Sequence, residues 1–401
     1  MDFFSKIFKG DKTIWCIFFA LCIVSLLEVF SASSTLVSGK RSYWEPVLYH
    51  AVFLLVGFGL VVFIQRVPTR FFSILLLLLP VSCLMLLFVM SEGESINGAR
   101  RWIDIIDGFS FQPSELAKIS VIGFVAFILS KTNKENEKTM FYILLAGIGI
   151  PCLLILVHNL STALLIALVC FLMMYLGQIS WKRLGGTALI CLAFVFILVG
   201  SLKVLPEKMV EDYFPERFKT WKGRIDKFVE PSDDSGEQVI NVRQISEKEF
   251  QVIHAKIAIA NGGILSLPGS GDQRDVLPQA FSDFIYAIIL EEMGFLGGLF
   301  VLLLYVALMV RAGMLATRCK KNFPKFLLLG SALILTVQAL INMAVAVNLM
   351  PVTGQPLPLV SKGGTSILIT CMFFGIILAC SNVENLEHED VDEDIANVKF
   401  E

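Results

Sequence analysis

Long apolar stretches separated by short polar segments repeat along most of this chain. Ten of them reach about the 20 residues that an α-helix needs to cross a bilayer. Each is continuously apolar, whereas the strands of a membrane β-barrel alternate between apolar and polar positions. The pattern predicts an all-α polytopic membrane protein with ten transmembrane helices, at about residues 13–33, 45–65, 71–91, 113–130, 139–157, 161–178, 186–204, 282–310, 326–348 and 363–382.

Composition supports this fold class and excludes several functions. The 401 residues are 56% hydrophobic and 17% charged, against roughly 45–50% and 25% in soluble domains, and the mean hydropathy is +0.74. A net charge of −2 excludes a broadly basic nucleic-acid-binding protein. The sequence contains no Walker-type loop, so we expect no nucleotide cofactor.

Lysine and arginine residues in the short connecting segments predict the orientation. If the N-terminus is cytoplasmic, the inside segments hold 15 of these residues and the short outside segments hold 5. The positive-inside rule then places both termini in the cytoplasm. One long extracytoplasmic segment, about 203–281, separates the seventh and eighth helices. We expect residues 1–382 to form one membrane domain and residues 383–401 to form an acidic, solvated cytoplasmic tail.

The long outside segment contains one further helical pattern. Apolar residues recur at spacings of three and four, which is typical of an amphipathic helix. We expect this helix to lie at the outer membrane surface or to dip into it. The residues are Phe250, Ile253, Ile257, Ala260 and Ile264.

A first polar cluster surrounds the start of the fourth predicted helix. Pro113 suits the first turn of a helix, where its missing N–H costs nothing. Glu115 and Lys118 are three residues apart on one helix face and can pair. Arg100 and Arg101 precede them, and the arginine fork suits a phosphate-bearing headgroup. The alternative is purely structural: a helix cap, an interfacial tryptophan and a local salt bridge.

A second cluster lies where the eighth predicted helix begins. Glycines make the preceding loop flexible, and Asp283 falls just below the predicted outer surface. A partly desolvated carboxylate is a better base, because burial disfavours its charged form. The alternative is that Ser282 or Asp283 only caps the helix. Glu291 and Glu292 lie two to three turns further in, and one of them is a candidate for a polar cavity.

A third cluster consists of Asn342 and residues 348–366, and the latter combine three prolines with paired glycines. Irregular backbone at membrane depth is tolerated only where it is buried in protein or lines a cavity. Lys362 stands at the mouth of the tenth predicted helix. It either contacts phosphate or extends its ammonium to the membrane interface. All three clusters lie on the predicted outer face, and their pattern alone does not separate a transporter, a channel and an enzyme.

The three clusters resemble the signatures of one protein family. The segments are NGARRWI followed by QPSELAK, LPQAFSDFIYAIILEEMGFLG, and PVTGQPLPLVSKGGTS. Together and in this order they resemble the SEDS family, whose members are FtsW, RodA and SpoVE. The resemblance covers nearly the whole chain.

The resemblance implies a peptidoglycan glycosyltransferase that polymerises lipid II on the outer face of the cytoplasmic (inner) membrane. It implies that Asp283 is the catalytic residue and that a divalent cation, Mg²⁺ or Mn²⁺, is required, although the spacing of possible ligands identifies no metal site. Candidate substrate-binding residues are Arg100, Arg101, Asp275, Lys118, Glu115, Lys362 and Ser361.

The resemblance also implies partners: a class B penicillin-binding protein, which is a transpeptidase, and proteins of the division machinery. Thr353-Gly354 after Pro351-Val352 is more similar to the division members of the family than to the elongation members. An elongation or cell-shape polymerase is the alternative within the family. A lipid II flippase is the alternative of a different class, since a charged cavity within ten helices also suits transport.

Overall fold

The computed structural model describes most of the predicted membrane domain. The predicted tail and most of the predicted outside segment lie outside the described residues. The residues that the structure describes are 7–32, 45–92, 94–96, 99–106, 109–204, 247–266, 271–273, 276 and 282–382.

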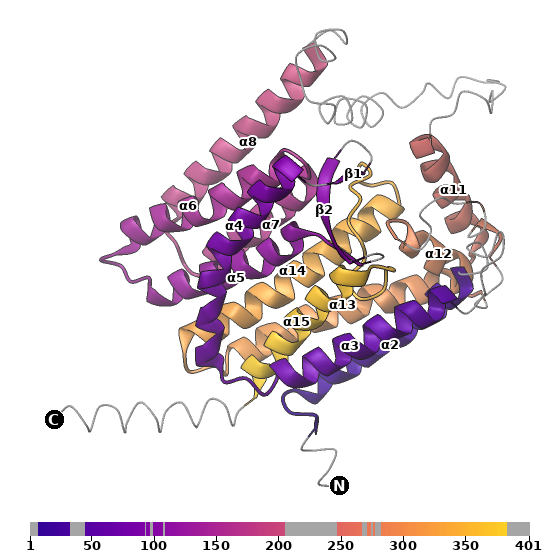
Figure 1. Cartoon of the computed structure of the whole chain (residues 1–401), viewed down its shortest axis with the longest axis horizontal. Helices are drawn as coiled ribbons and strands as arrows, with labels where there is room; N and C mark the ends of the chain where they lie inside the picture. Colours follow the sequence, from indigo (N-terminus) through magenta and orange to yellow (C-terminus); the bar gives the residue numbers. More distant parts are fainter. Residues whose placement is uncertain are drawn as a thin grey trace.

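Helices build the described part of the chain, and every apolar stretch predicted from the sequence coincides with one or two of them (Figure 1). Among the described residues, eight helical segments are long and apolar enough to cross a membrane, while α7 is apolar but shorter. The chain is therefore a multi-pass membrane protein, and the count of ten spans stays a prediction. The helices are α2 (Lys12–Ala32), α3 (Glu45–Ile64), η2 (Thr69–Ile74), α4 (Leu75–Glu92), α5 (Pro113–Lys131), α6 (Glu137–Leu156), α7 (Leu160–Leu176), α8 (Trp181–Val204), α11 (Glu247–Asn261), α12 (Ile285–Glu292), α13 (Gly294–Ala316), α14 (Asn322–Ala346) and α15 (Gly364–Ser381).

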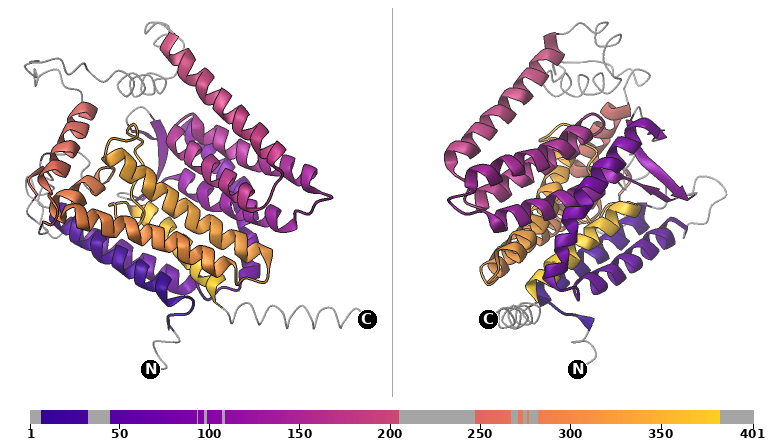
Figure 2. Two further views of the ribbon diagram at one scale, coloured as in Figure 1. Left: turned by 180° about the vertical axis from the view of Figure 1, so that it is seen from behind. Right: turned by 60° about the vertical axis from the view of Figure 1, so that its left-hand side comes forward.

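Helix α14 forms the centre of the bundle. Within an apolar 18-residue stretch of α14, 83% of the residues are buried, and in the corresponding stretches of α5 and α15 the share is 72%. Helix α14 packs against α5, α7, α13 and α15, and it crosses the middle of the molecule in Figures 1 and 2. In α3 and in α6 only 28% of the residues of such a stretch are buried, so these helices expose their apolar surface outward. Helix α8 diverges from the bundle in both figures.

The start of α2 and the end of α15 lie at the same end of the bundle. Asp11 accepts hydrogen bonds from the first backbone N–H groups of α2 and from Arg311 of α13, and its own backbone N–H donates to Ser381 Oγ. Burial raises the pKa of Asp11, but the Arg311 and backbone hydrogen bonds outweigh burial and hold it below its usual range. Because the start of α2 and the end of α15 are adjacent, the chain between them crosses the membrane an even number of times.

The eighth predicted helix is broken, which the sequence analysis did not anticipate. Helix α12 stops at Glu292, and α13 starts at Gly294, whose φ is +71°. A Cβ at Gly294 would lie 2.7 Å from the carbonyl oxygen of Ile264, so a larger residue does not fit. The first N–H groups of α13 donate to the carbonyls of Gly263 and Ile264. The break therefore depends on the segment that follows α11.

The predicted amphipathic helix is α11, and it ends at Asn261, before Ile264. Its small residues Ala255 and Ala258 are buried and its isoleucines Ile253 and Ile257 remain more than one-third exposed. Helix α11 packs against α12. The outward-facing isoleucine stripe fits a helix that lies against lipid.

Three short strands precede α5, in a short outside segment for which the sequence analysis predicted no strand. They pair antiparallel in the order β1–β2–β3, with Ser95 opposite Arg100 and Ile103 opposite Phe111. The strands are β1 (Glu94–Ile96), β2 (Ala99–Ile106) and β3 (Phe109–Phe111).

Candidate active site

The irregular segment 348–363 is anchored by side chains from three helices. Four of its carbonyl oxygens accept hydrogen bonds from buried side chains. Lipid cannot hydrogen-bond to these backbone groups, and water does not reach them, so the side chains satisfy them instead. The prediction of irregular backbone buried in protein is thus confirmed for residues 357–361. The bonds run from Asn342 to Gln355 O at 2.8 Å, from Gln338 to Pro356 O at 2.9 Å, from Tyr305 to Pro358 O at 2.5 Å and from Ser25 to Val360 O at 3.1 Å.

Leu359 shows that this segment is held in a conformation that its residues do not prefer. Its φ is +68°, in the left-handed region that costs a non-glycine residue about 1–2 kcal/mol. Its side chain is 2% exposed. Strained residues of this kind persist only where the surroundings over-determine them. The four anchored carbonyls, two of which flank Leu359, supply that constraint.

The segment 282–284 packs against the same loop. Asn342 Nδ2 donates to the backbone carbonyl of Asp283 at 2.9 Å, and Ser361 Oγ donates to the carbonyl of Ser282 at 2.6 Å. Asp283 Oδ2 would lie 3.5 Å from a Cβ added at Gly354. The structure therefore brings the second and third polar clusters together, with the Asp283 side chain half-buried between them.

The capping interpretation of Ser282 and Asp283 is wrong. The N-cap position of α12 is Phe284, and no side chain caps the first turn. Ser282 Oγ donates instead to Asp283 Oδ1 at 3.1 Å. Because the backbone is fixed from α14 and from Ser361, the Asp283 carboxylate does not have to hold the helix.

The predicted pair on α5 is confirmed and connects to the loop. Pro113 lies in the first turn of α5, and Lys118 Nζ lies 2.8 Å from Glu115 Oε1 with both side chains under 10% exposed. Lys118 also donates to Gln338 Oε1 at 3.0 Å, and Gln338 in turn donates to Pro356 O. A buried ion pair thus positions the irregular segment through one glutamine.

The start of α7 joins the same network, a contact that the sequence analysis missed. Gln355 Nε2 donates to Thr162 Oγ1 at 2.8 Å, and the side chain of Asn159 caps α7 by accepting from the Thr162 N–H. Thr162, Gln338 and Gln355 are all under 5% exposed. Single polar residues within otherwise apolar stretches, such as Thr162 and Gln338, were the feature of the sequence that could have indicated this network.

Lys362 and Ser361 follow the anchored carbonyls. Lys362 is half-buried, and burial lowers the pKa of its ammonium group. Ser361 is buried and its hydroxyl bridges the Leu357 N–H and the Ser282 carbonyl. Ser361 therefore positions the loop, and its predicted contact with substrate stays a prediction.

Other predicted site residues are not placed by the described structure. The backbone of Arg100 and Arg101 belongs to β2, but their side chains lie outside the described part. Asp275 lies outside the described residues altogether. Their predicted contacts with substrate therefore stay predictions.

The described residues offer a divalent cation few protein ligands near Asp283. No group of three or more His, Cys, Asp or Glu side chains gathers within the described ranges, and Glu115 is already paired with Lys118. Mg²⁺ commonly binds one or two carboxylates together with substrate phosphates. The site fits such a cation through Asp283 and a phosphate-bearing substrate, not as a cage built by the protein.

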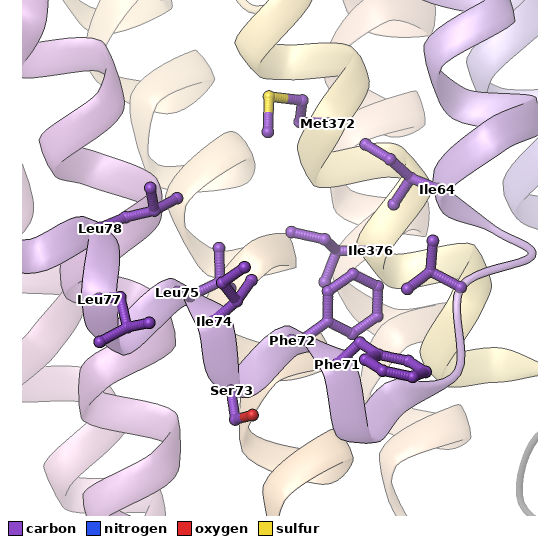
Figure 3. Close-up of a pocket in the computed structure, with 11 residues that line it drawn as sticks. Ile64, Phe71, Phe72, Ser73, Ile74, Leu75, Leu77, Leu78, Met372 and Ile376 are labelled. Atoms are coloured by element: carbon purple, nitrogen blue, oxygen red, sulfur yellow. The ribbon is translucent and has the colours of Figure 1, made fainter.

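A separate apolar cavity lies elsewhere in the bundle. It has a volume of about 460 Å³ and is lined by residues of α3, η2, α4 and α15, all apolar except for Ser73 (Figure 3). Ile376, one of its lining residues, is twelve residues along α15 from Gly364, or about 18 Å at the rise of an α-helix. This cavity therefore belongs to the end of the bundle near Ser381 and not to the Asp283 site.

The sequence matches the family described as "Cell cycle protein", that of FtsW, RodA and SpoVE, over residues 11–386. The chain belongs to this family. A probable peptidoglycan glycosyltransferase FtsW of Geobacter sulfurreducens is 29% identical, with 94% of this chain and 96% of the relative covered. The peptidoglycan glycosyltransferase MrdB of Escherichia coli K12 is also 29% identical, with 92% of each chain covered.

Solved structures of low sequence identity share the fold. A chain from a peptidoglycan synthase complex that coordinates polymerization and crosslinking has a TM-score of 0.70 at 24% identity, covering 92% of this chain and 97% of that chain. The rod shape determining protein RodA of Thermus thermophilus has a TM-score of 0.62 at 23% identity, covering 92% and 96%. This chain therefore has the same fold as these proteins.

Proposed function

We propose that this chain is a peptidoglycan glycosyltransferase that polymerises lipid II at the outer face of the cytoplasmic membrane. The observation that carries the proposal is the Asp283 carboxylate, half-buried against Gly354, with its backbone fixed by Asn342 and Ser361. Relatives that bear the name peptidoglycan glycosyltransferase match 92–94% of this chain at 29% identity, which supports the same reaction here.

Asp283 acts as the general base in this proposal. The 4-hydroxyl of an acceptor N-acetylglucosamine attacks the anomeric carbon of the N-acetylmuramic acid of a second substrate. The new glycosidic bond forms as the bond to undecaprenyl pyrophosphate breaks, with inversion at the anomeric carbon. Asp283 takes the hydroxyl proton, and the pyrophosphate leaves with the bonding electron pair. A base positioned by a rigid backbone contributes about 10²–10⁴-fold to such a step.

Positive charge is needed where the pyrophosphate leaves. Lys362 lies near the end of the irregular segment 348–363, after the anchored carbonyls, and Arg100 and Arg101 precede α5. Asp283 would help to hold a divalent cation, Mg²⁺ or Mn²⁺, which would supply charge neutralisation for the leaving pyrophosphate. Glu115 and Lys118 act through Gln338 on the loop, and Asp275 is assigned to substrate or cation binding on the same side of the membrane.

The topology that goes with this function has ten spans and both termini in the cytoplasm. The adjacent ends of α2 and α15 support an even number of crossings. The excess of lysine and arginine in the predicted inside segments supports the orientation. In this arrangement Asp283 and the anchored loop face outward, where lipid II presents its disaccharide.

We assign the chain to septal synthesis, with a class B penicillin-binding protein and other division proteins as partners. Thr353-Gly354 supports the division role, and the fold shared with a chain of a peptidoglycan synthase complex supports a transpeptidase partner. Relatives named FtsW and MrdB are equally identical, so elongation is retained as the alternative role for the same reaction.

Polymerisation and transport are separated by one pair of assays on the chain co-purified with its transpeptidase. We expect glycan chains to form from lipid II in detergent with Mg²⁺ or Mn²⁺ present. A flippase would instead move lipid II across a liposome membrane and leave it unpolymerised. Transport without polymer would contradict the proposal and favour the flippase.

Arg100→Ala and Arg101→Ala are each expected to weaken the use of lipid II. A desolvated phosphate contact contributes about 1.5–3 kcal/mol, which corresponds to roughly a 10- to 150-fold loss at limiting substrate. The measurement is the initial rate of polymerisation below saturation. Lys182→Ala, at the predicted inner end of α8, is the matched control and should leave the rate unchanged. Wild-type rates in both arginine variants would favour the purely structural interpretation.

A further inference from the structure

A buried histidine on α3 and a buried serine on α2 lie next to the irregular segment 348–363. His50 is 1% exposed, and Ser25 is 0% exposed. Ser25 Oγ lies 2.7 Å from His50 Nε2 and 3.1 Å from the carbonyl oxygen of Val360. Helices α2 and α3 pack against each other, so both reach the end of the irregular segment through one hydroxyl group.

The hydroxyl of Ser25 carries a single hydrogen, which sets the direction of these two contacts. Within the described part of the chain, Val360 O accepts from no group other than Ser25. If Ser25 donated to His50 instead, this carbonyl would lose its donor. The imidazole hydrogen would then lie on Nδ1, which is buried without a hydrogen-bond partner. Buried donors and acceptors without partners are costly, so the favoured arrangement has the hydrogen on Nε2.

The carbonyl that Ser25 holds is next to residues of the proposed site. Val360 directly precedes Ser361, whose Oγ donates to the carbonyl of Ser282. This contact fixes the backbone immediately before Asp283. A hydrogen bond that fixes Val360 therefore acts, through one neighbouring residue, on the segment that carries the proposed base.

Helix α3 contacts the irregular segment at a second point. Phe53 lies about one turn from His50, on the same face of α3. A Cβ added at Gly364, the first residue of α15, would lie 3.3 Å from the Phe53 ring. Helix α3 thus holds the chain on both sides of Lys362, at Val360 through Ser25 and at Gly364 through Phe53.

We propose that His50 is a positioning residue for polymerisation, an inference that rests on the proposed function. As a neutral ring with its hydrogen on Nε2, His50 donates to Ser25 Oγ, and Ser25 donates to Val360 O. We call this chain of two hydrogen bonds the His50–Ser25 relay. It orients the end of the irregular segment and exchanges no proton with the substrate.

NMR of the histidine nitrogens tests the relay in the full chain without lipid II. The chain has four histidines, and the signals that disappear in His50→Gln belong to His50. We expect a neutral ring that carries its hydrogen on Nε2. Ser25→Ala removes the acceptor and is expected to shift the Nε2 signal or to populate the other tautomer. A wild-type ring with its hydrogen on Nδ1 would overturn the proposal.

Polymerisation by the chain co-purified with its transpeptidase tests the positioning role. His50→Leu and Ser25→Ala are each expected to lower the initial rate by about three- to tenfold, the change that the loss of one buried hydrogen bond produces. Because His50 acts through Ser25, the double variant should lose no more than the stronger single variant. His50→Gln keeps an N–H donor of similar reach and should retain most of the rate.

Val52→Ala, on the exposed side of α3, is the control and should leave the rate unchanged. Losses that multiply in the double variant would show that His50 does not act through Ser25 and would overturn the proposal. So would a wild-type rate in His50→Leu. A wild type that forms no polymer would contradict the proposed function, while the His50 tautomer and its response to Ser25→Ala would still decide whether the relay exists.

Discussion

Asp283→Asn is expected to reduce glycan polymerisation by about 10²–10⁴-fold, the contribution of a general base. Asparagine has nearly the same shape, and the backbone contacts from Asn342 and Ser361 do not involve the replaced group. The variant should therefore fold and bind its transpeptidase. The measurement is polymer formation by the purified complex with excess Mg²⁺ or Mn²⁺, with lipid II binding measured separately.

Two other variants define the control for this result. Asp272→Asn changes an exposed carboxyl in the neighbouring loop and should leave the rate close to that of the wild type. Asp275→Asn should cost less than Asp283→Asn, because Asp275 is assigned to binding and not to proton transfer. Near-normal polymerisation by Asp283→Asn would remove this residue as the base and reopen the flippase alternative.

Lys118→Met is expected to lower the free energy of unfolding by about 3–5 kcal/mol, because it leaves the buried Glu115 carboxylate without its partner. Methionine retains the length and apolar character of the lysine stem. The variant also removes the hydrogen bond to Gln338, which holds Pro356 O. Polymerisation should therefore fall at temperatures where the protein is still folded. Chemical denaturation of the purified chain in detergent measures the stability.

A double variant separates the charge from the positioning role. Glu115→Gln added to Lys118→Met removes the uncompensated charge and should recover more than half of the lost stability, because neighbouring substitutions are not additive. Activity should stay low, since Gln338 remains without the lysine. Lys131→Met, at the exposed end of the same helix, is the control. Wild-type stability in Lys118→Met would show that the ion pair contributes nothing.

The break at Gly294 illustrates what sequence reasoning could not reach. Residues 282–310 are apolar enough to form one span, and composition alone predicts one. The helix breaks because the carbonyls of Gly263 and Ile264 bind the first N–H groups of α13. Those residues belong to a segment whose position depends on how α11 packs on α12, which no local pattern encodes.

The sequence by itself determined the membrane class, the approximate positions of the apolar helices apart from the break between α12 and α13, and the Glu115–Lys118 pair. Transfer of apolar residues to lipid depends on composition over about 20 residues, and an i,i+3 pair depends on helix geometry alone. Only the tertiary structure decided which polar groups meet. Lys118 and Gln338 are 220 residues apart, Gln355 and Thr162 are 193 apart, and Ser31 and Glu292 are 261 apart. Such contacts arise because buried polar groups must find partners among whatever helices pack beside them, and helix packing is a property of the whole bundle.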